Sequence, residues 1–254
     1  MCTLVMLRRP GHAWPLLLAA NRDEMADRHW APPGRHWPDR PDVVAGQDLV
    51  AGGSWLGVND YGVVAAILNR PGSLGPAPGK RSRGELVLEA LDHADAVAAA
   101  AGLIQLDTDA YRPFNMVVAD DRDAYWLRHD ATGRIEELTI PDGVSILTAN
   151  DLNDLSSARI RRYLPRFEAA RVPDPDAGDW SEWQQLMASR VSEAGAGPRG
   201  ALNIVTDGPY GTVSSSLIAL PEFAPADVGA PPRKPVWLFA AGRPDEAPYQ
   251  PVPF

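Results

Sequence analysis

The chain begins with the stretch MCTLVMLRRPGHAWPLLLAANRDE (residues 1–24), which decides the fold that we expect. Two apolar runs, Thr3 to Leu7 and Leu16 to Ala20, flank a Pro-Gly turn signal, and this pattern is typical of a β-hairpin. Cys2 comes directly before the first strand, and Asn21-Arg22-Asp23-Glu24 ends the second. Antiparallel pairing brings these two ends together. The stretch therefore predicts a thiol beside a charged segment.

Further strands and helices follow in blocks. Apolar runs bounded by Asp, Gly or Pro predict strands at 52–58, 62–68, 114–119, 124–128, 135–140, 144–148, 201–206, 213–220 and 236–240. Helical spacing predicts one or two helices over 83–101, and others over 156–171 and 180–193. The Pro- and Trp-rich stretch 26–41 and residues 71–79 predict loops. We expect the four strands between 114 and 148 to complete a second sheet. The order of the blocks predicts an α+β fold, a four-layer αββα sandwich with mainly antiparallel sheets.

Composition sets the broad class. The 254 residues are 45% hydrophobic and 22% charged, near globular averages, and we expect a single domain over 1–254. The formal net charge of −9 disfavours nucleic acid as a partner. The apolar run from Trp14 to Ala20 is too short to span a bilayer, and the start of the chain lacks the pattern of a signal peptide. We therefore expect a cytoplasmic protein without a membrane span.

The only cysteine is Cys2, so an intrachain disulfide and a cysteine-based zinc cluster are excluded. Its small side chain permits removal of Met1, which would place a thiol and a free α-amine on one residue. With a reference pKa of roughly 7.7–8.0, that amine can act as the general base for its own nucleophile. The alternative is that Cys2 is a small core residue of the first strand.

Four other residues are candidates for the same site. Arg22 would hold Cys2 as the thiolate, and Asp23 would orient the α-ammonium; the alternative is a surface ion pair. Asn69 and Asn150 each follow an apolar run, and either amide can donate to an oxyanion in acyl transfer. The alternative for each asparagine is a turn, because asparagine tolerates the left-handed conformation found at strand ends.

Several motifs together resemble the NRDE family, which is also known as transport and Golgi organisation 2-like. They run in order from the first residue to about Arg162, with a weaker match at Tyr210-Gly211-Thr212: MCTL (1–4), LAANRDE (18–24), GGSWLG (52–57), SRGEL (82–86) and FN (114–115). That family is distantly similar to N-terminal-nucleophile (Ntn) hydrolases of the choloylglycine-hydrolase and penicillin-acylase type. Those enzymes have an αββα fold and an N-terminal cysteine, and they cut non-peptide amide bonds.

The resemblance implies roles for the candidate residues. Cys2 matches the nucleophile, Arg22 and Asp23 match charged residues beside it, and Asn69 and Asn150 match asparagines of the oxyanion site. One departure is Val213, which stands where many relatives have arginine in a Tyr-Gly-Thr-Arg pattern. The change removes an expected charge from the site, or leaves room for an apolar ligand.

Histidine spacing gives no metal site, since the five histidines are far apart: His12, His29, His36, His93 and His129. Family members are linked to haem trafficking, so His29 or His36 beside tryptophans is a candidate axial ligand for transported haem. The alternative is a loop anchored on the sheet by its aromatic side chains.

Two functions remain open at this point. The first is an Ntn-type cysteine hydrolase that cleaves an amide or thioester through Cys2 after Met1 removal, without a cofactor. The second is a non-catalytic trafficking protein whose cleft binds haem, an acyl-CoA or another amphipathic ligand. A retained Met1 would block the α-amine mechanism, and an apolar cleft without Arg22 would favour carriage.

Overall fold

The computed structural model describes residues 2–223 and 233–254. Its elements in chain order are β1 (Thr3–Arg8), β2 (Leu16–Met25), β3 (Trp30–Gly34), β4 (Val43–Asp48), β5 (Leu56–Asn59), β6 (Val64–Asn69), α1 (Gly84–Leu91), α2 (Ala96–Leu103), β7 (Phe114–Ala119), β8 (Ala124–His129), β9 (Ile135–Thr139), β10 (Gly143–Leu147), α3 (Ala158–Ala169), α4 (Ser181–Met187), β11 (Tyr210–Leu220), β12 (Val236–Ala240) and β13 (Tyr249–Pro251).

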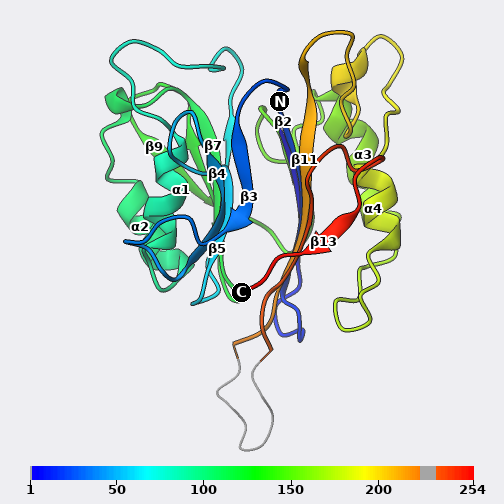
Figure 1. Ribbon diagram of the computed structural model, residues 1–254, viewed down its shortest axis with the longest axis horizontal. Helices are drawn as coiled ribbons and strands as arrows, with labels where there is room; N and C mark the ends of the chain where they lie inside the picture. Colours follow the sequence, from blue (N-terminus) through cyan, green and yellow to red (C-terminus); the bar gives the residue numbers. More distant parts are fainter. Residues whose placement is uncertain (1, 224–232) are drawn as a thin grey trace, which may run out of the picture.

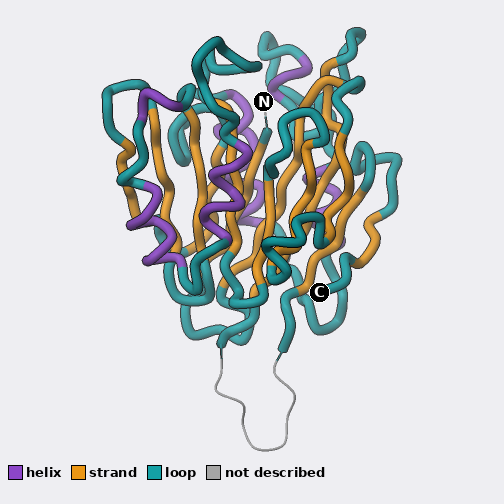
Figure 2. The backbone as a smooth tube through the Cα atoms, turned by 60° about the vertical axis from the view of Figure 1, so that its left-hand side comes forward, coloured by secondary structure: helices purple, strands orange, loops and turns teal. Residues whose placement is uncertain are grey.

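The strands form two antiparallel sheets that stack face to face between layers of helices (Figure 1). The six-stranded sheet has the order β10-β1-β2-β11-β12-β13, and the seven-stranded sheet has the order β3-β4-β5-β6-β7-β8-β9. Helices α3 and α4 cover the six-stranded sheet, while α1 and α2 cover the seven-stranded sheet; Figure 2 shows the same layers from another side. The predicted αββα sandwich is confirmed.

Alternation of side chains along the strands divides the apolar residues into three layers. The central layer lies between the sheets and includes Leu4, Leu18, Val58 and Ile218. A second layer packs the seven-stranded sheet against α1 and α2. The third packs the six-stranded sheet against α3 and α4. Inner strands such as β1, β2 and β7 are therefore buried on two faces, which fixes their register.

The predicted first hairpin is present, and a third strand joins it. Thr3 pairs with Asn21 in the antiparallel β1–β2 ladder, and β2 pairs on its other side with β11. The β2–β11 register shifts between Thr212 and Ser214, so Val213 is the extra residue of a β-bulge. Such a bulge re-aims the side chains that follow it.

Several predictions about the strands are wrong. The four strands between 114 and 148 do not share one sheet, because β10 crosses over to pair with β1. Residues 201–206 form no strand, since the backbone of Asn203 bonds to Ser189 near the end of α4. Strands β3 and β4 were not predicted: β3 lies in the expected loop at 26–41, where two prolines are tolerated because β3 is an edge strand.

None of the helices in the described part of the chain combines the length and the apolar character that a membrane crossing requires.

Candidate functional site

One row of side chains crosses three strands of the six-stranded sheet at the start of β1. Because Thr3 pairs with Asn21, Cys2 lies opposite Arg22, and Arg22 in turn pairs with Ser214. We call Cys2, Arg22 and Ser214 the inner row, since all three line the pocket that faces the seven-stranded sheet. The hairpin register thus confirms the predicted proximity of Cys2 to Arg22 and Asp23.

The thiol of Cys2 is held against the backbone of β2. Cys2 Sγ accepts a hydrogen bond from the Asp23 amide at 3.4 Å and lies 3.7 Å from the Asp23 carbonyl oxygen, to which it can donate. Burial of the thiol, and next the Asp23 carboxylate, raise the pKa of Cys2, and the opposing effect of Arg22 is smaller. These surroundings therefore disfavour the expected thiolate and favour the protonated thiol.

The raised pKa gives a testable pH dependence. Alkylators react with the thiolate, so labelling of Cys2 by iodoacetamide is expected to rise with pH through a midpoint above that of free cysteine. The measurement is the labelling rate by intact mass across a pH series, with free cysteine as the control. The midpoint is compared rather than the rate, because burial also slows access at every pH. A midpoint at or below that of free cysteine would contradict this description of the thiol.

Asp23 points to the opposite face of the sheet, toward α3. Its carboxylate accepts a hydrogen bond from Thr212 Oγ1 at 2.6 Å and lies 3.4 Å from Arg159 Nη1. Arg159 also donates to Thr3 Oγ1 at 2.5 Å and to the Arg199 carbonyl at 2.7 Å. The side chains are 0% exposed for Asp23 and 4% for Arg159. A buried, hydrogen-bonded ion pair thus underlies the start of β1.

Helix α3 supplies Arg159 from its first turn. Ser157 is the N-cap residue and its side chain accepts from the Ile160 amide, which fixes the start of the helix directly beside the sheet. A cation in the first turn is opposed by the helix dipole. The ion pair with Asp23 offsets this cost, so the placement of Arg159 is governed by the site rather than by helix stability.

Arg22 bridges the two sheets. Its guanidinium stacks on the Trp55 ring at 4.2 Å and lies 3.7 Å from Asp48 Oδ2. Stacking and the nearby carboxylate hold the group in place. Its Nη1 atom is buried and has no hydrogen-bond partner among the described residues. Burial lowers the pKa of Arg22, while Cys2 is the first of the groups that oppose this effect. The free donor of a buried cation therefore lies close to the thiol.

A narrow pocket joins these groups. The volume that the centre of a water molecule can occupy is about 20 Å³. The total space between the atoms, which includes the open mouth of the pocket, is about 330 Å³. A water needs roughly 10–15 Å³ by the first measure, so the pocket holds about one water. It is lined by Cys2, Thr3, Leu4, Ala20, Asn21, Arg22, Trp55, Leu56, Ala66, Ile67, Leu68, Ser214 and Ser216.

The two predicted oxyanion asparagines lie near this end of the sandwich but outside the lining of the pocket. Asn69 ends β6 and pairs with Phe114. The Asn150 side chain donates to Asp154 Oδ2 at 3.1 Å. Asn115, whose side chain donates to the carbonyls of Thr148 and Asn150, ties β7 to the end of β10. The structure thus brings Cys2, Arg22 and Asp23 together and leaves both asparagines at the edge.

Val213, which stands where relatives have an arginine, is the extra residue of the β-bulge in β11. Val213 is half-buried and does not line the pocket. The bulge lets Thr212 face Asp23 while Ser214, two residues later, faces the pocket, although an unbroken strand would point both to the same side. The arginine that contacts Asp23 is Arg159, so positive charge remains on that face of the site.

The two histidines proposed as axial ligands of haem, His29 and His36, do not face a common pocket. His36 Nε2 lies 2.7 Å from the Pro32 carbonyl oxygen, and its ring meets Trp37 edge-on. His29 is exposed. Both histidines lie outside the lining of the Cys2 pocket.

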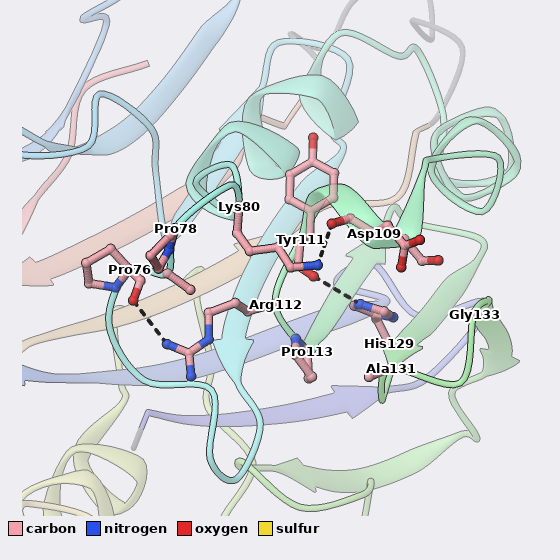
Figure 3. Close-up of a pocket in the computed structure, with 12 residues that line it drawn as sticks. Pro76, Pro78, Lys80, Asp109, Tyr111, Arg112, Pro113, His129, Ala131 and Gly133 are labelled. Carbon is pink, nitrogen blue, oxygen red and sulfur yellow. Dashed lines mark hydrogen bonds between the residues drawn. The ribbon is translucent and has the colours of Figure 1, made fainter.

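A wider surface pocket of about 400 Å³ lies elsewhere, between the loop before α1 and the strands β7 and β8 (Figure 3). Its cationic groups already have partners. Arg112 donates to the carbonyls of Leu74, Gly75 and Gly72, and Lys80 donates to the Asp109 carbonyl. These contacts anchor the loop, so we assign the site to the Cys2 pocket.

Sequence reasoning missed Arg159, Thr212 and the two pocket serines. Arg159 and Thr212 are separated from Asp23 by 136 and 189 residues, and only the tertiary fold brings them together. The Ser-Ser-Ser run at 214–216 was visible, but alternation along a strand alone does not show which serine faces the pocket.

Comparison with known proteins gives the family. The sequence profile described as Transport and Golgi organisation 2 matches residues 1–221. The chain is 32% identical over 117 residues to the Transport and Golgi organization 2 homolog of Mus musculus, and 32% identical over 117 residues to the homolog of Homo sapiens. Each match covers 43% of this chain and 40% of the relative. The chain thus aligns with about two fifths of these relatives' length.

Solved structures with a similar fold are Ntn hydrolases. A Caenorhabditis elegans ortholog of N-acylethanolamine-hydrolyzing acid amidase superposes with a TM-score of 0.57 at 11% identity, covering 85% of this chain and 92% of that one. A variant of conjugated bile acid hydrolase from Clostridium perfringens gives 0.53 at 12% identity, covering 100% and 97%. Penicillin V acylase from Agrobacterium tumefaciens gives 0.50 at 13% identity, covering 95% and 83%. With this Ntn-hydrolase fold and the profile match over most of its length, the chain belongs to the Transport and Golgi organisation 2 family.

Proposed function

We propose that this protein is an Ntn-type hydrolase of a non-peptide amide or a thioester, with Cys2 as the nucleophile. The observation that supports this most is the position of Cys2 Sγ, held by the Asp23 backbone at a pocket that also contains the buried, unpartnered donor of Arg22. The structural neighbours are named for cleaving N-acylethanolamines, conjugated bile acids and penicillin V, which favours an acyl group in amide linkage.

The reaction has two steps. Cys2 Sγ attacks the carbonyl carbon of the substrate, an S–C bond forms, and the C–N or C–S bond to the leaving group breaks. The thiol proton passes to the leaving amine or thiol. Water then attacks the acyl-enzyme, which releases the acid and returns the proton to Cys2. The balance requires no cofactor and no redox partner.

A protonated thiol needs a base in the first step. Removal of Met1 would supply one, since the α-amine of Cys2 has a reference pKa of roughly 7.7–8.0 and sits on the nucleophile itself. The Asp23 carboxylate, paired with Arg159 and bonded to Thr212, would orient that amine as its ammonium forms. Asp23 and Arg159 are therefore positioning residues in this proposal.

Charge develops on the carbonyl oxygen during attack, and donors aimed at it lower the barrier. Asn69 and Asn150 stay candidates for this role. The Asn150 amide would have to leave Asp154, to which it is bonded here, while no hydrogen bond of the Asn69 side chain is found among the described residues. Binding of substrate is the event expected to recruit them.

The test is intact mass of the untagged protein before and after incubation with an S-phenyl thioester. Loss of one methionine mass, followed by addition of one acyl mass at Cys2, is the expected result. Mapping by tandem mass spectrometry locates the acyl group. A retained Met1 with no acylation by any thioester would overturn the proposal.

Carriage of haem or an acyl-CoA is the competing function, and it is not adopted. Haem and an acyl-CoA are each far larger than the room beside Cys2, so either ligand would require a wider separation of the sheets than a short acyl group does. Titration with haem, followed by absorbance, and with an acyl-CoA, followed by calorimetry, would reveal such binding if the hydrolase test fails.

A further inference from the structure

Two hydroxyls in the pocket form no hydrogen bond with the described residues. Ser214 and Ser216 are 1% and 2% exposed and both line the pocket, and no hydrogen bond of either hydroxyl is found in the part of the chain that the structure describes. Ser215, between them, faces the other way and bonds to the Ala20 carbonyl and to Tyr249 Oη. Neither oxygen is among the fully buried unpartnered atoms of the described residues, so both keep some open surface toward the pocket. The two hydroxyls are therefore suited to receive a ligand's polar atom.

Arg22 adds a third unmet group to the same wall. Its Nη1 is buried and unpartnered among the described residues, while the rest of the guanidinium is fixed by Trp55 and Asp48. In the inner row Arg22 lies between Cys2 and Ser214. A carbonyl bonded to Cys2 Sγ would therefore meet Arg22 first, and the rest of the acyl group would reach the serines beyond it.

The opposite wall is apolar and closes the pocket to long chains. Leu56, Leu68 and Trp55 face the inner row from the seven-stranded sheet, and Leu4 lies at the bottom, where the central core layer begins. A long alkyl chain would have to displace this packed layer and would leave three polar groups unmet. A short acyl group that brings its own oxygen displaces less of this layer and offers the polar groups a partner.

Strand spacing sets the place of that oxygen. Neighbouring strands lie roughly 4.8 Å apart, so the β11 serines are about two strand spacings from β1. With the carbonyl carbon counted as the first, an oxygen on the second carbon would lie too close to Cys2. An oxygen on the third carbon would reach further toward the serines.

We propose that the acyl group transferred to Cys2 is short and carries a hydroxyl at its third carbon, the carbonyl being the first. Ser214 and Ser216 bind this hydroxyl, and Arg22 Nη1 donates to the carbonyl oxygen. The inference rests on the proposed hydrolase function and names the substrate class of that site.

The test compares two thioesters that differ in one group. S-phenyl 3-hydroxybutyrate and S-phenyl 3-methylbutyrate have nearly the same shape, with a hydroxyl in one replaced by a methyl in the other. Acylation of Cys2 is followed by intact mass, and each rate is divided by the rate with free cysteine, which removes intrinsic reactivity. In each reaction an S–C bond forms between Cys2 and the acyl carbon, the bond between that carbon and the thiophenol sulfur breaks, and thiophenol leaves with the thiol proton.

The hydroxylated probe is expected to react about tenfold faster or more after this correction, since 1.4 kcal/mol corresponds to a factor of ten. Ser214→Ala and Ser216→Ala are each expected to reduce the ratio. Ser215→Ala is the matched control on the opposite face of the same strand and is expected to leave the ratio unchanged. Circular dichroism confirms that each variant folds.

The Arg22→Met variant distinguishes binding of the carbonyl oxygen from binding of the substrate hydroxyl. Because both probes share the carbonyl, this change is expected to slow both by on the order of 10²-fold while the ratio between them stays the same. A change in the ratio instead would place Arg22 at the hydroxyl and overturn its assigned role.

The outcomes distinguish this inference from the function on which it rests. If Cys2 is acylated but the ratio is near one, or if S-phenyl laurate reacts faster than either short probe, the substrate class is wrong and the hydrolase proposal stands. If Cys2 is acylated by none of the probes, the hydrolase proposal fails and this inference fails with it.

Discussion

Cys2→Ala is expected to abolish acyl transfer by this protein. The change removes the only thiol of the chain and leaves the pocket and the ion pair beneath it intact. Loss of a catalytic nucleophile costs on the order of 10⁶ in turnover in a well-studied protease, so the residual rate is expected at background. The measurement is hydrolysis of the S-phenyl thioester that acylates the wild-type protein best.

Cys2→Ser is the control for this result. It keeps an α-amine and a nucleophile of similar size on the same residue, so Met1 removal and folding are preserved. A slow but measurable acylation of the hydroxyl in this variant would separate loss of the sulfur from loss of the fold. Hydrolysis by Cys2→Ala at the wild-type rate would show that the thiol is not the nucleophile.

Arg159→Met is expected to be among the most destabilising single changes in the chain. The substitution removes the buried cation beside the Asp23 carboxylate, which is 0% exposed, and it removes the donors to Thr3 and to the Arg199 carbonyl. Breaking a buried pair from one side costs about 3–5 kcal/mol. Urea denaturation with an unchanged m value would measure the loss.

The same helix offers a matched control. Arg161 is two residues further along α3 and pairs with Glu193 at the surface, where its side chain is 48% exposed. Exposed pairs contribute about 0–1 kcal/mol, so Arg161→Met is expected to cost less than about 1 kcal/mol. Equal losses for the two variants would mean that burial of the Asp23–Arg159 pair is not what stabilises this end of the sheet.

The sequence predicted the fold to the extent that its determinants are local. The hairpin of β1 and β2 follows from two apolar runs around a turn, and pairing of its strand ends predicts that Cys2 meets Asp23. The transfer of β10 to the other sheet was not predictable in this way, because Pro141 and Asp142 mark a turn whether or not the strands on either side pair. Its partner β1 is about 140 residues away, and only packing of both sheets selects that pairing.

The candidate site divides along the same line. Cys2, Arg22 and Asp23 lie in one hairpin, so local pairing finds them. Arg159 was not expected, because a sequence gives no direct sign that a helix will begin beside a given strand. Val213 was expected to face the site, but it lies outside the pocket lining. The reason is that a residue of a bulge does not point to the side that simple alternation along the strand assigns to it.

The two faces of β1, β2 and β11 separate the residues that would position the α-amine from the residues that would contact the substrate. Asp23, Thr212 and Arg159 lie on the helix side, while Arg22, Ser214 and Ser216 lie on the pocket side. Substitutions on one side can thus accumulate without disturbing contacts on the other. Relatives that share the charged face but differ at the pocket serines would be expected to process different acyl groups by one common mechanism, so the family could diversify its metabolites while its reaction stays constant.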